Sequence, residues 1–144
     1  MRDAGLRVSG LCRGGMFPAA SADERRARIE DTRRAIDEAA TLATEALVLV
    51  CGAAPDRDIE GARAMVADAI GQLIPDARAS GVRLAIEPLH PMFAAERSVI
   101  TLLGEALDLA ERFDTPEVGV IIDAYHVWWD PYLYEQIRRS PGRV

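Results

Sequence analysis

The sequence predicts an α/β fold built on a parallel β-sheet, and two observations support this prediction. The first is a set of four short, nearly continuous apolar runs, which are typical of strands covered on both faces. The second is that longer segments with the period of amphipathic helices lie between these runs. Such regular alternation is typical of parallel strands joined by helical crossovers. The four runs are residues 6–11, 46–51, 82–87 and 118–123.

The first helix is expected to begin just after Ser21, because the segment Ser-Ala-Asp-Glu has the form of a capping box. In this motif the Ser21 hydroxyl accepts a hydrogen bond from an unpaired backbone N–H, and Glu24 reaches back to the cap. The apolar residues that follow at helical spacing are Ile29, Ile36, Ala40 and Ala43. The segment therefore predicts a helix with one face packed on the sheet.

The second helical segment carries a longer apolar stripe. Gly81 follows the stripe and is placed to end the helix in a left-handed conformation. The residues of the stripe are Ile59, Ala62, Val66, Ala69, Leu73 and Ala77.

Two further helices complete the alternation. A helix from about residue 98 should end at Thr115-Pro116, and a last helix should begin with Asp130 as its cap and Pro131 in its first turn. The chain is therefore predicted to contain four βα units.

The polar residues at the strand ends favour a segment of a (β/α)8 barrel over an open doubly wound sheet. Side chains alternate along a strand, so Glu87 is placed on the face opposite the helices, and Asp123 has the same position on the last strand. Catalytic groups lie at the C-terminal ends of strands in both architectures, but no glycine-rich phosphate turn follows the first strand here. A barrel is the better match.

Composition limits the function classes. The chain has 144 residues, 49% of them hydrophobic, which suits one domain with its own core. A net charge of −6 provides no basic surface for nucleic acid or anionic lipid. The sequence has neither an apolar run of membrane-spanning length nor the apolar segment of a signal peptide at its N-terminus, so a cytoplasmic location is expected. Cys12 and Cys51 are expected to be reduced, buried thiols.

Two motifs resemble those of a known family. Residues 85–91 are AIEPLHP, residues 120–131 are VIIDAYHVWWDP, and a helical segment connects them. Together they are similar to the sugar phosphate isomerase/epimerase family, the xylose isomerase-like TIM barrels, and residues 4–17 resemble that family's second strand and the loop after it. The resemblance implies that residues 1–144 are a single partial TIM-barrel domain, family strands two to five, truncated at both ends.

The resemblance also implies a metal site. In the family, the glutamate ending the fourth strand and the aspartate ending the fifth bind a divalent metal, and the histidine three residues later contacts the substrate. The matching residues are Glu87, Asp123 and His126, and Glu87 is also the expected catalytic base. Ligands of these types suit Mn²⁺, Mg²⁺ or Co²⁺. His90 and Trp128 are expected to contact the substrate as well.

The residue types agree with the chemistry that the family implies. Isomerising or epimerising a sugar requires a carboxylate base to remove a proton next to a carbonyl, while a cation stabilises the enediolate oxygen. The implied function is a metal-dependent sugar or sugar phosphate isomerase or epimerase acting on a small sugar or hydroxy-keto compound. Structural roles are the alternatives: a helix cap for Asp123, and a ring packed beside Trp128 for His126.

The family's barrel has eight strands, so half of it has no counterpart in this chain, including a histidine and a second glutamate that complete the metal site. The chain alone is therefore expected to be an incomplete catalyst that associates with a second copy or with a missing barrel half. Two other functions remain open. One is a non-catalytic truncated fragment, and the other is a metal-dependent apurinic endonuclease-like enzyme, against which the net charge of −6 argues.

Overall fold

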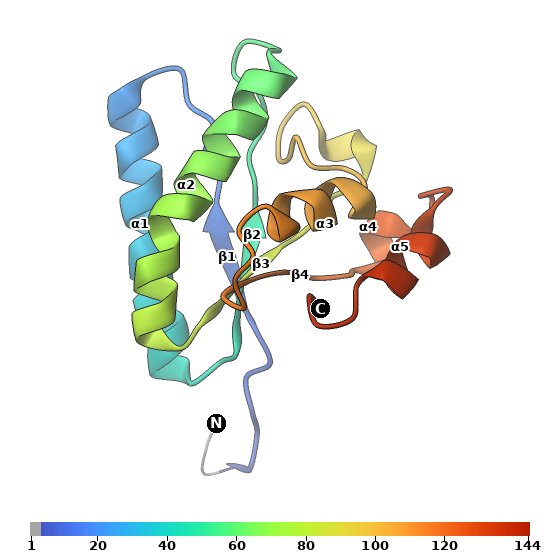
Figure 1. Cartoon of the computed structure of the whole chain (residues 1–144). Coiled ribbons are helices and arrows are strands. Elements are labelled where there is room, and N and C mark those ends of the chain that lie inside the picture. Colours follow the sequence, from blue (N-terminus) through green and yellow to red (C-terminus); the bar gives the residue numbers. More distant parts are fainter. Residues whose placement is uncertain (1–3) are drawn as a thin grey trace.

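The computed structural model describes residues 4–144, which form a four-stranded parallel sheet with helices packed against it (Figure 1). The strands pair in the order of the sequence. They are β1 (Leu11–Gly15), β2 (Ala46–Val50), β3 (Arg83–Ile86) and β4 (Val118–Val120). The predicted α/β fold with four parallel strands is therefore confirmed.

Helices connect the strands and bury one side of the sheet. α1 (Ala22–Leu42) packs on β1 and β2 and against α2 (Ile59–Ser80), which packs on β3, while α3 (Leu103–Glu111) packs on β4. Shorter helices follow two of the strands: η2 (Pro91–Phe93) after β3, and α4 (Ala124–Val127) and α5 (Leu133–Arg139) after β4. The largest fully buried core residues include Ile36, Leu47, Leu49, Ile70, Leu73, Leu84, Ile86 and Leu107.

α1 begins where predicted, with the Ser21 half of the capping box but without the return bond from Glu24 among the described residues, and its buried face is shifted. The Ser21 hydroxyl accepts a hydrogen bond from the N–H of Glu24 at 3.2 Å. Ile29 and Ile36 are buried, but Ala39 is buried in place of the predicted Ala40. Ala43 is exposed because it ends the helix in the left-handed conformation, with φ +53°.

The stripe on α2 is confirmed for five of its six residues, which are all buried. Ile59 is the exception, with 51% of its surface exposed, because it is the first residue of the helix and lies beyond the sheet. Gly81 ends the helix with φ +67°, as predicted.

β1 begins later than predicted, at Leu11 and not at residue 6. Leu6 is 62% exposed, and the pairing with β2 begins where Leu11 faces Leu47. The strand then continues through two glycines. A Cβ on Gly14 would lie 2.8 Å from the Thr32 methyl group, so the close approach of α1 requires a glycine where an apolar side chain is usual for a strand.

α3 and the last helix also begin later than predicted. Residues 98–102 are not helical, because the Ser98 hydroxyl bonds the N–H and the carbonyl of Ile100, and Glu105 accepts hydrogen bonds from the N–H groups of Thr101 and Leu102. α5 begins at Leu133, and α4 was not predicted.

The buried Asp130 is not the N-terminal cap of α5. One of its oxygens accepts from the N–H of Tyr132 and the other from the N–H of Leu103 at the start of α3. Asp130 therefore ties the segment after β4 to α3.

The free edge of β4 is partly covered. The N–H of Val120 donates a hydrogen bond of 2.7 Å to the carbonyl of Arg143, which places the last described residues beside the strand. Ala85 is buried although it lies on the sheet face away from the helices, while Ile121 is half-buried. No helix among residues 4–144 is both long and apolar enough to cross a membrane, and the cytoplasmic location stays a prediction.

Candidate metal and substrate site

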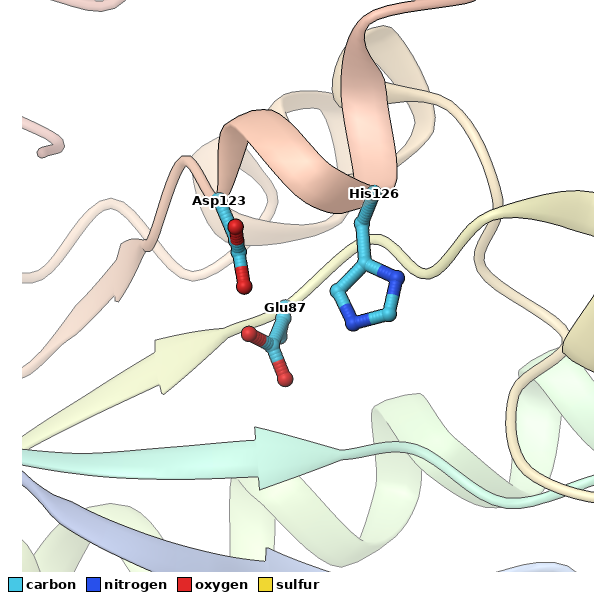
Figure 2. Close-up of side chains that lie close together, drawn as sticks. All are labelled: Glu87, Asp123 and His126. Carbon is cyan, nitrogen blue, oxygen red and sulfur yellow. The ribbon is translucent and has the colours of Figure 1, made fainter.

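The two strand-end carboxylates lie together at the C-terminal end of the sheet. β3 and β4 are parallel neighbours in which Ile86 faces Val120. Glu87 follows β3 directly, and Asp123 immediately precedes α4. One ligand atom from each of Glu87, Asp123 and His126 lies within 4.8 Å of the others (Figure 2). The three side chains are therefore close enough to hold one ion or one small polar group.

Local sequence fixes the backbone of Glu87. Its N–H donates to the carbonyl of Leu49 at 3.1 Å, so sheet pairing continues one residue past β3. Pro88 follows, and a residue before proline favours the extended conformation. On the neighbouring strand, the N–H of Ile121 donates to the carbonyl of Ile86 at 3.0 Å. Both carboxylates therefore project from a hydrogen-bonded part of the sheet.

Asp123 caps a helix and still offers an oxygen to the site. Its Oδ1 accepts a hydrogen bond of 2.8 Å from the N–H of Tyr125, the second residue of α4. A carboxylate has two oxygens with about four lone pairs, so the cap leaves one oxygen free. The structural role and the predicted ligand role are therefore compatible in this residue.

Glu87 has the electrostatic character of a ligand or a base. Its carboxylate is half-buried, and no group among the described residues donates a hydrogen bond to it. Burial raises the pKa of Glu87 above its usual range, the negative charge of Asp123 raises it further, and Arg97 opposes both. A cation between the two carboxylates would relieve this repulsion.

His126 is better suited to donate a hydrogen bond than to bind a metal. Its Nδ1 accepts a hydrogen bond of 3.3 Å from the backbone N–H of His90. Burial, the largest effect, lowers the pKa of His126, which favours the neutral ring. A neutral ring that accepts at Nδ1 carries its proton on Nε2, and Figure 2 shows one ring nitrogen turned toward Glu87. His126 therefore presents an N–H to the site.

His90 and Trp128 lie next to this site, but their contacts are with other side chains. The His90 ring stacks on Trp128, with centroids 6.0 Å apart, and meets Trp129 edge-on at 5.7 Å. Its Nδ1 accepts from the N–H of Met92, which caps η2. Trp128 is 70% exposed, so its outer face is open to a ligand. Their role as substrate contacts stays a prediction.

Phe93 and Arg97 lie next to the site, and the sequence did not predict a contribution from either. The Phe93 ring meets the His126 ring edge-on at 5.6 Å, and the Arg97 guanidinium lies over Phe93 at 5.5 Å from the ring centroid. Both residues belong to the loop after β3, and no residue motif in this loop indicates a binding site. The only indication in the sequence is that the loop follows the C-terminal end of a strand.

The prediction of two buried thiols is half wrong. Cys12 is exposed because it lies on the sheet face that no helix covers, whereas Cys51 is fully buried, and burial raises its pKa to about 12.

The sequence matches the family model described as "Xylose isomerase-like TIM barrel" over residues 1–143. Protein SMc04130 from Sinorhizobium meliloti 1021 is 54% identical; the match covers 96% of this chain and 51% of that protein, with a TM-score of 0.93. A comparison with curated protein sequences gave no match.

Two more distant structures share the fold. One is the 3-keto-D-glucoside 4-epimerase YcjR from E. coli, at 20% identity and a TM-score of 0.80, with 99% of this chain and 58% of that protein covered. The other is the IolI protein, solved with a zinc atom, at 16% identity and a TM-score of 0.79, with 96% and 49% covered. The chain spans about half the length of these relatives. It belongs to the xylose isomerase-like TIM-barrel family and forms part of such a barrel.

Proposed function

We propose that the chain supplies one half of the active site of a divalent-metal-dependent sugar or sugar phosphate isomerase or epimerase. The observation that carries the proposal is the convergence of Glu87, Asp123 and His126 at the C-terminal ends of two neighbouring strands. Enzymes with this fold have their catalytic residues at this end of the barrel. The name of the E. coli neighbour, a 3-keto-D-glucoside 4-epimerase, supports a carbohydrate substrate.

Glu87 and Asp123 are the residues that would hold the metal. Two neighbouring carboxylates that form no ion pair within residues 4–144 favour a hard divalent ion such as Mn²⁺, Mg²⁺ or Co²⁺, and the zinc atom of the IolI structure supports a cation site in this fold. With two protein ligands from this chain, affinity should be weak. When bound, the ion supplies stabilisation of negative charge on a substrate oxygen.

Glu87 is the residue best placed to move the proton. Its raised pKa brings it closer to the value that suits a general base. In the proposed step its carboxylate takes the proton from the carbon next to the carbonyl. The C–H electron pair becomes the C=C bond of an enediol as the carbonyl π pair moves to oxygen. Return of the proton by Glu87 to the former carbonyl carbon, as the proton of the adjacent hydroxyl moves to the former carbonyl oxygen, gives the isomer. Protonation of the original carbon on its opposite face would need a second acid, from the half of the barrel that this chain does not match, and gives the epimer.

His126 and the loop rings would position the substrate. The Nε2–H of His126 can donate to a substrate oxygen next to the reacting carbon. The exposed face of Trp128 offers an apolar surface for the C–H face of a sugar. The net charge of −6 favours a small sugar over the DNA of an endonuclease.

Manganese binding tests the site. Titration of the chain with Mn²⁺, followed by electron paramagnetic resonance of the free ion, should show weak binding of one ion. Glu87→Gln should abolish it, and Glu38→Gln, which changes an exposed glutamate on α1, should not. Equal binding by the two variants would show that the ion binds elsewhere and would refute the assignment.

Activity tests whether the half-site is sufficient. We expect little or no turnover of ketoses by the purified chain with Mn²⁺, since further ligands come from the half of the family barrel that this chain does not match. Clear turnover that Glu87→Gln abolishes would support the role of Glu87 and contradict the incompleteness. Turnover that Glu87→Gln leaves unchanged would contradict the mechanism. Absence of both turnover and Mn²⁺ binding would support the non-catalytic alternative.

A further inference from the structure

Arg97 stands at the mouth of the candidate site. Its guanidinium lies over the Phe93 ring at 5.5 Å, and the Phe93 ring meets the His126 ring edge-on at 5.6 Å. These two contacts connect the charge of Arg97 to the group that faces Glu87 and Asp123. The positive charge of Arg97 also acts on both groups: it partly offsets the rise in the pKa of Glu87 and adds to the lowering of the pKa of His126.

The backbone of Arg97 is held in place at the end of β2. Its carbonyl accepts a hydrogen bond of 2.8 Å from the N–H of Gly52, and the carbonyl of Gly52 accepts one of 2.9 Å from the N–H of Val99. Its own N–H donates to the carbonyl of Phe93 at 2.8 Å. The loop is therefore a fixed part of the mouth, and Arg97 approaches the site from a defined position.

The side chain of Arg97 has no ion-pair or hydrogen-bond partner among residues 4–144. Eight other arginines form ion pairs with carboxylates: Arg25, Arg26, Arg33, Arg34, Arg63, Arg78, Arg139 and Arg143. Arg97 makes neither an ion pair nor a side-chain hydrogen bond there. Stacking on an aromatic ring fixes a guanidinium plane while its N–H edges stay free. The free N–H donors of a guanidinium match the two oxygens of a carboxylate or phosphate.

We propose that Arg97 binds an anionic group of the substrate, a carboxylate or a phosphate, so that the preferred substrate is a hydroxy-keto acid or a phosphorylated ketose and not a neutral sugar. This inference rests on the proposed function, because it places the anion beside the carbonyl-binding site of Glu87 and His126. A solvated surface arginine is the competing explanation, and it predicts no preference among substrates of different charge.

Three small probes that share the HOCH₂–CO– group separate these explanations. They are dihydroxyacetone, which is neutral, hydroxypyruvate, which carries a carboxylate, and dihydroxyacetone phosphate. Calorimetric titration of the chain in the presence of Mn²⁺ should give tighter binding of at least one anionic probe than of the neutral one, by about tenfold for a charge-assisted pair. The anionic probe that binds more tightly shows whether the charged group of the substrate is a carboxylate or a phosphate.

Variants test whether Arg97 is responsible. Arg97→Gln should weaken the anionic probe by about tenfold and leave dihydroxyacetone unchanged, and Arg97→Lys should restore part of the loss because the charge returns without the planar fork. Arg112→Gln is the matched control, since it changes another exposed arginine without an ion pair, at the opposite end of α3. Equal affinities for all three probes, or an anionic preference that survives in Arg97→Gln, would overturn the inference.

The two proposals fail in different ways. If Arg97→Gln removes the anionic preference while Glu87→Gln leaves Mn²⁺ binding intact, the anion site stands and the metal assignment fails. If Glu87→Gln abolishes Mn²⁺ binding while the three probes bind alike, the metal assignment stands and the anion site fails.

Discussion

The backbone N–H of His90 donates a hydrogen bond of 3.3 Å to Nδ1 of His126, and so joins the loop after β3 to the helix after β4. This bond determines whether His126 presents a hydrogen-bond donor or a lone pair to the site. Because Nδ1 is occupied as an acceptor, the neutral ring turns an N–H, and not a lone pair, toward the two carboxylates. The ring can therefore donate to a substrate oxygen, and its role as a substrate contact stays a prediction.

Two substitutions at His126 separate the roles of its two nitrogens. His126→Gln places an amide N–H donor near the position of Nε2, whereas His126→Asn places an acceptor near Nδ1. Hydroxypyruvate affinity should fall by about tenfold in the Asn variant and by less in the Gln variant. Mn²⁺ affinity should change little in either. Loss of Mn²⁺ binding in both variants, measured by paramagnetic resonance, would show instead that His126 is a metal ligand.

Glu87 should reduce the stability of the fold at neutral pH. Its pKa is raised in the folded chain, so folding favours the protonated form, and this contribution is full below the unfolded pKa and is lost as pH rises through the folded pKa. Glu87→Gln should therefore increase the free energy of unfolding at pH 7, and the gain should disappear near pH 4. Urea denaturation at both pH values measures this. Glu38→Gln is the control, and a loss of stability in Glu87→Gln at pH 7 would contradict the prediction.

Gly52 should tolerate no side chain. Its φ is +101°, and a Cβ would lie 2.6 Å from Pro18 Cδ and 2.9 Å from the carbonyl carbon of Met16. Gly81 is the matched control, because its φ is also positive but nothing lies within 4 Å of its Cβ position. Thermal or urea unfolding should show a loss of about 1 kcal/mol in Gly81→Ala and a clearly larger loss in Gly52→Ala. Equal losses would show that the surroundings of Gly52 relax freely.

The chain should self-associate. β1 pairs with β2 alone among the described strands, and its other edge is open. Exposed aromatic side chains after β4 add apolar surface: Tyr125, Trp128, Tyr132 and Tyr134. Size-exclusion chromatography with light scattering should give a dimer or a larger species, and dilution should shift it toward monomer. A monomer at all concentrations, with sheet amides protected from hydrogen exchange, would contradict this expectation.

The sequence predicted the parts of the fold in which one residue pattern dominates. Continuous apolar runs located β2, β3 and the start of β4, because nearly every residue of those strands is buried. β1 was misplaced because close packing against Thr32 demands Gly14, and glycine carries no hydrophobic signal. The start of α3 was misplaced because its N-cap is the apolar Leu102, which carries no capping signal, and because the first N–H of the helix is bonded by Asp130, 27 residues later in the chain.

The candidate site was predictable in part for the same reason. Strand alternation was enough to place Glu87 and Asp123 on neighbouring strand ends. Arg97 was not predictable, since its position depends on a hydrogen bond to Gly52, 45 residues earlier in the chain. Local spacing contains no information about such a contact. The hydrogen bond between His90 and His126 likewise forms only once the loop after β3 meets α4.

The hydrogen bond between Asp123 and the N–H of Tyr125 gives the molecule a built-in reporter. Any ion or substrate that draws electron density from the free oxygen of Asp123 must also weaken the acceptor on its other oxygen. The amide proton of Tyr125 then becomes less deshielded and exchanges faster with water. A single backbone resonance in the spectrum of ¹⁵N-enriched protein, titrated with diamagnetic Mg²⁺, can therefore follow occupancy of the site without any substitution.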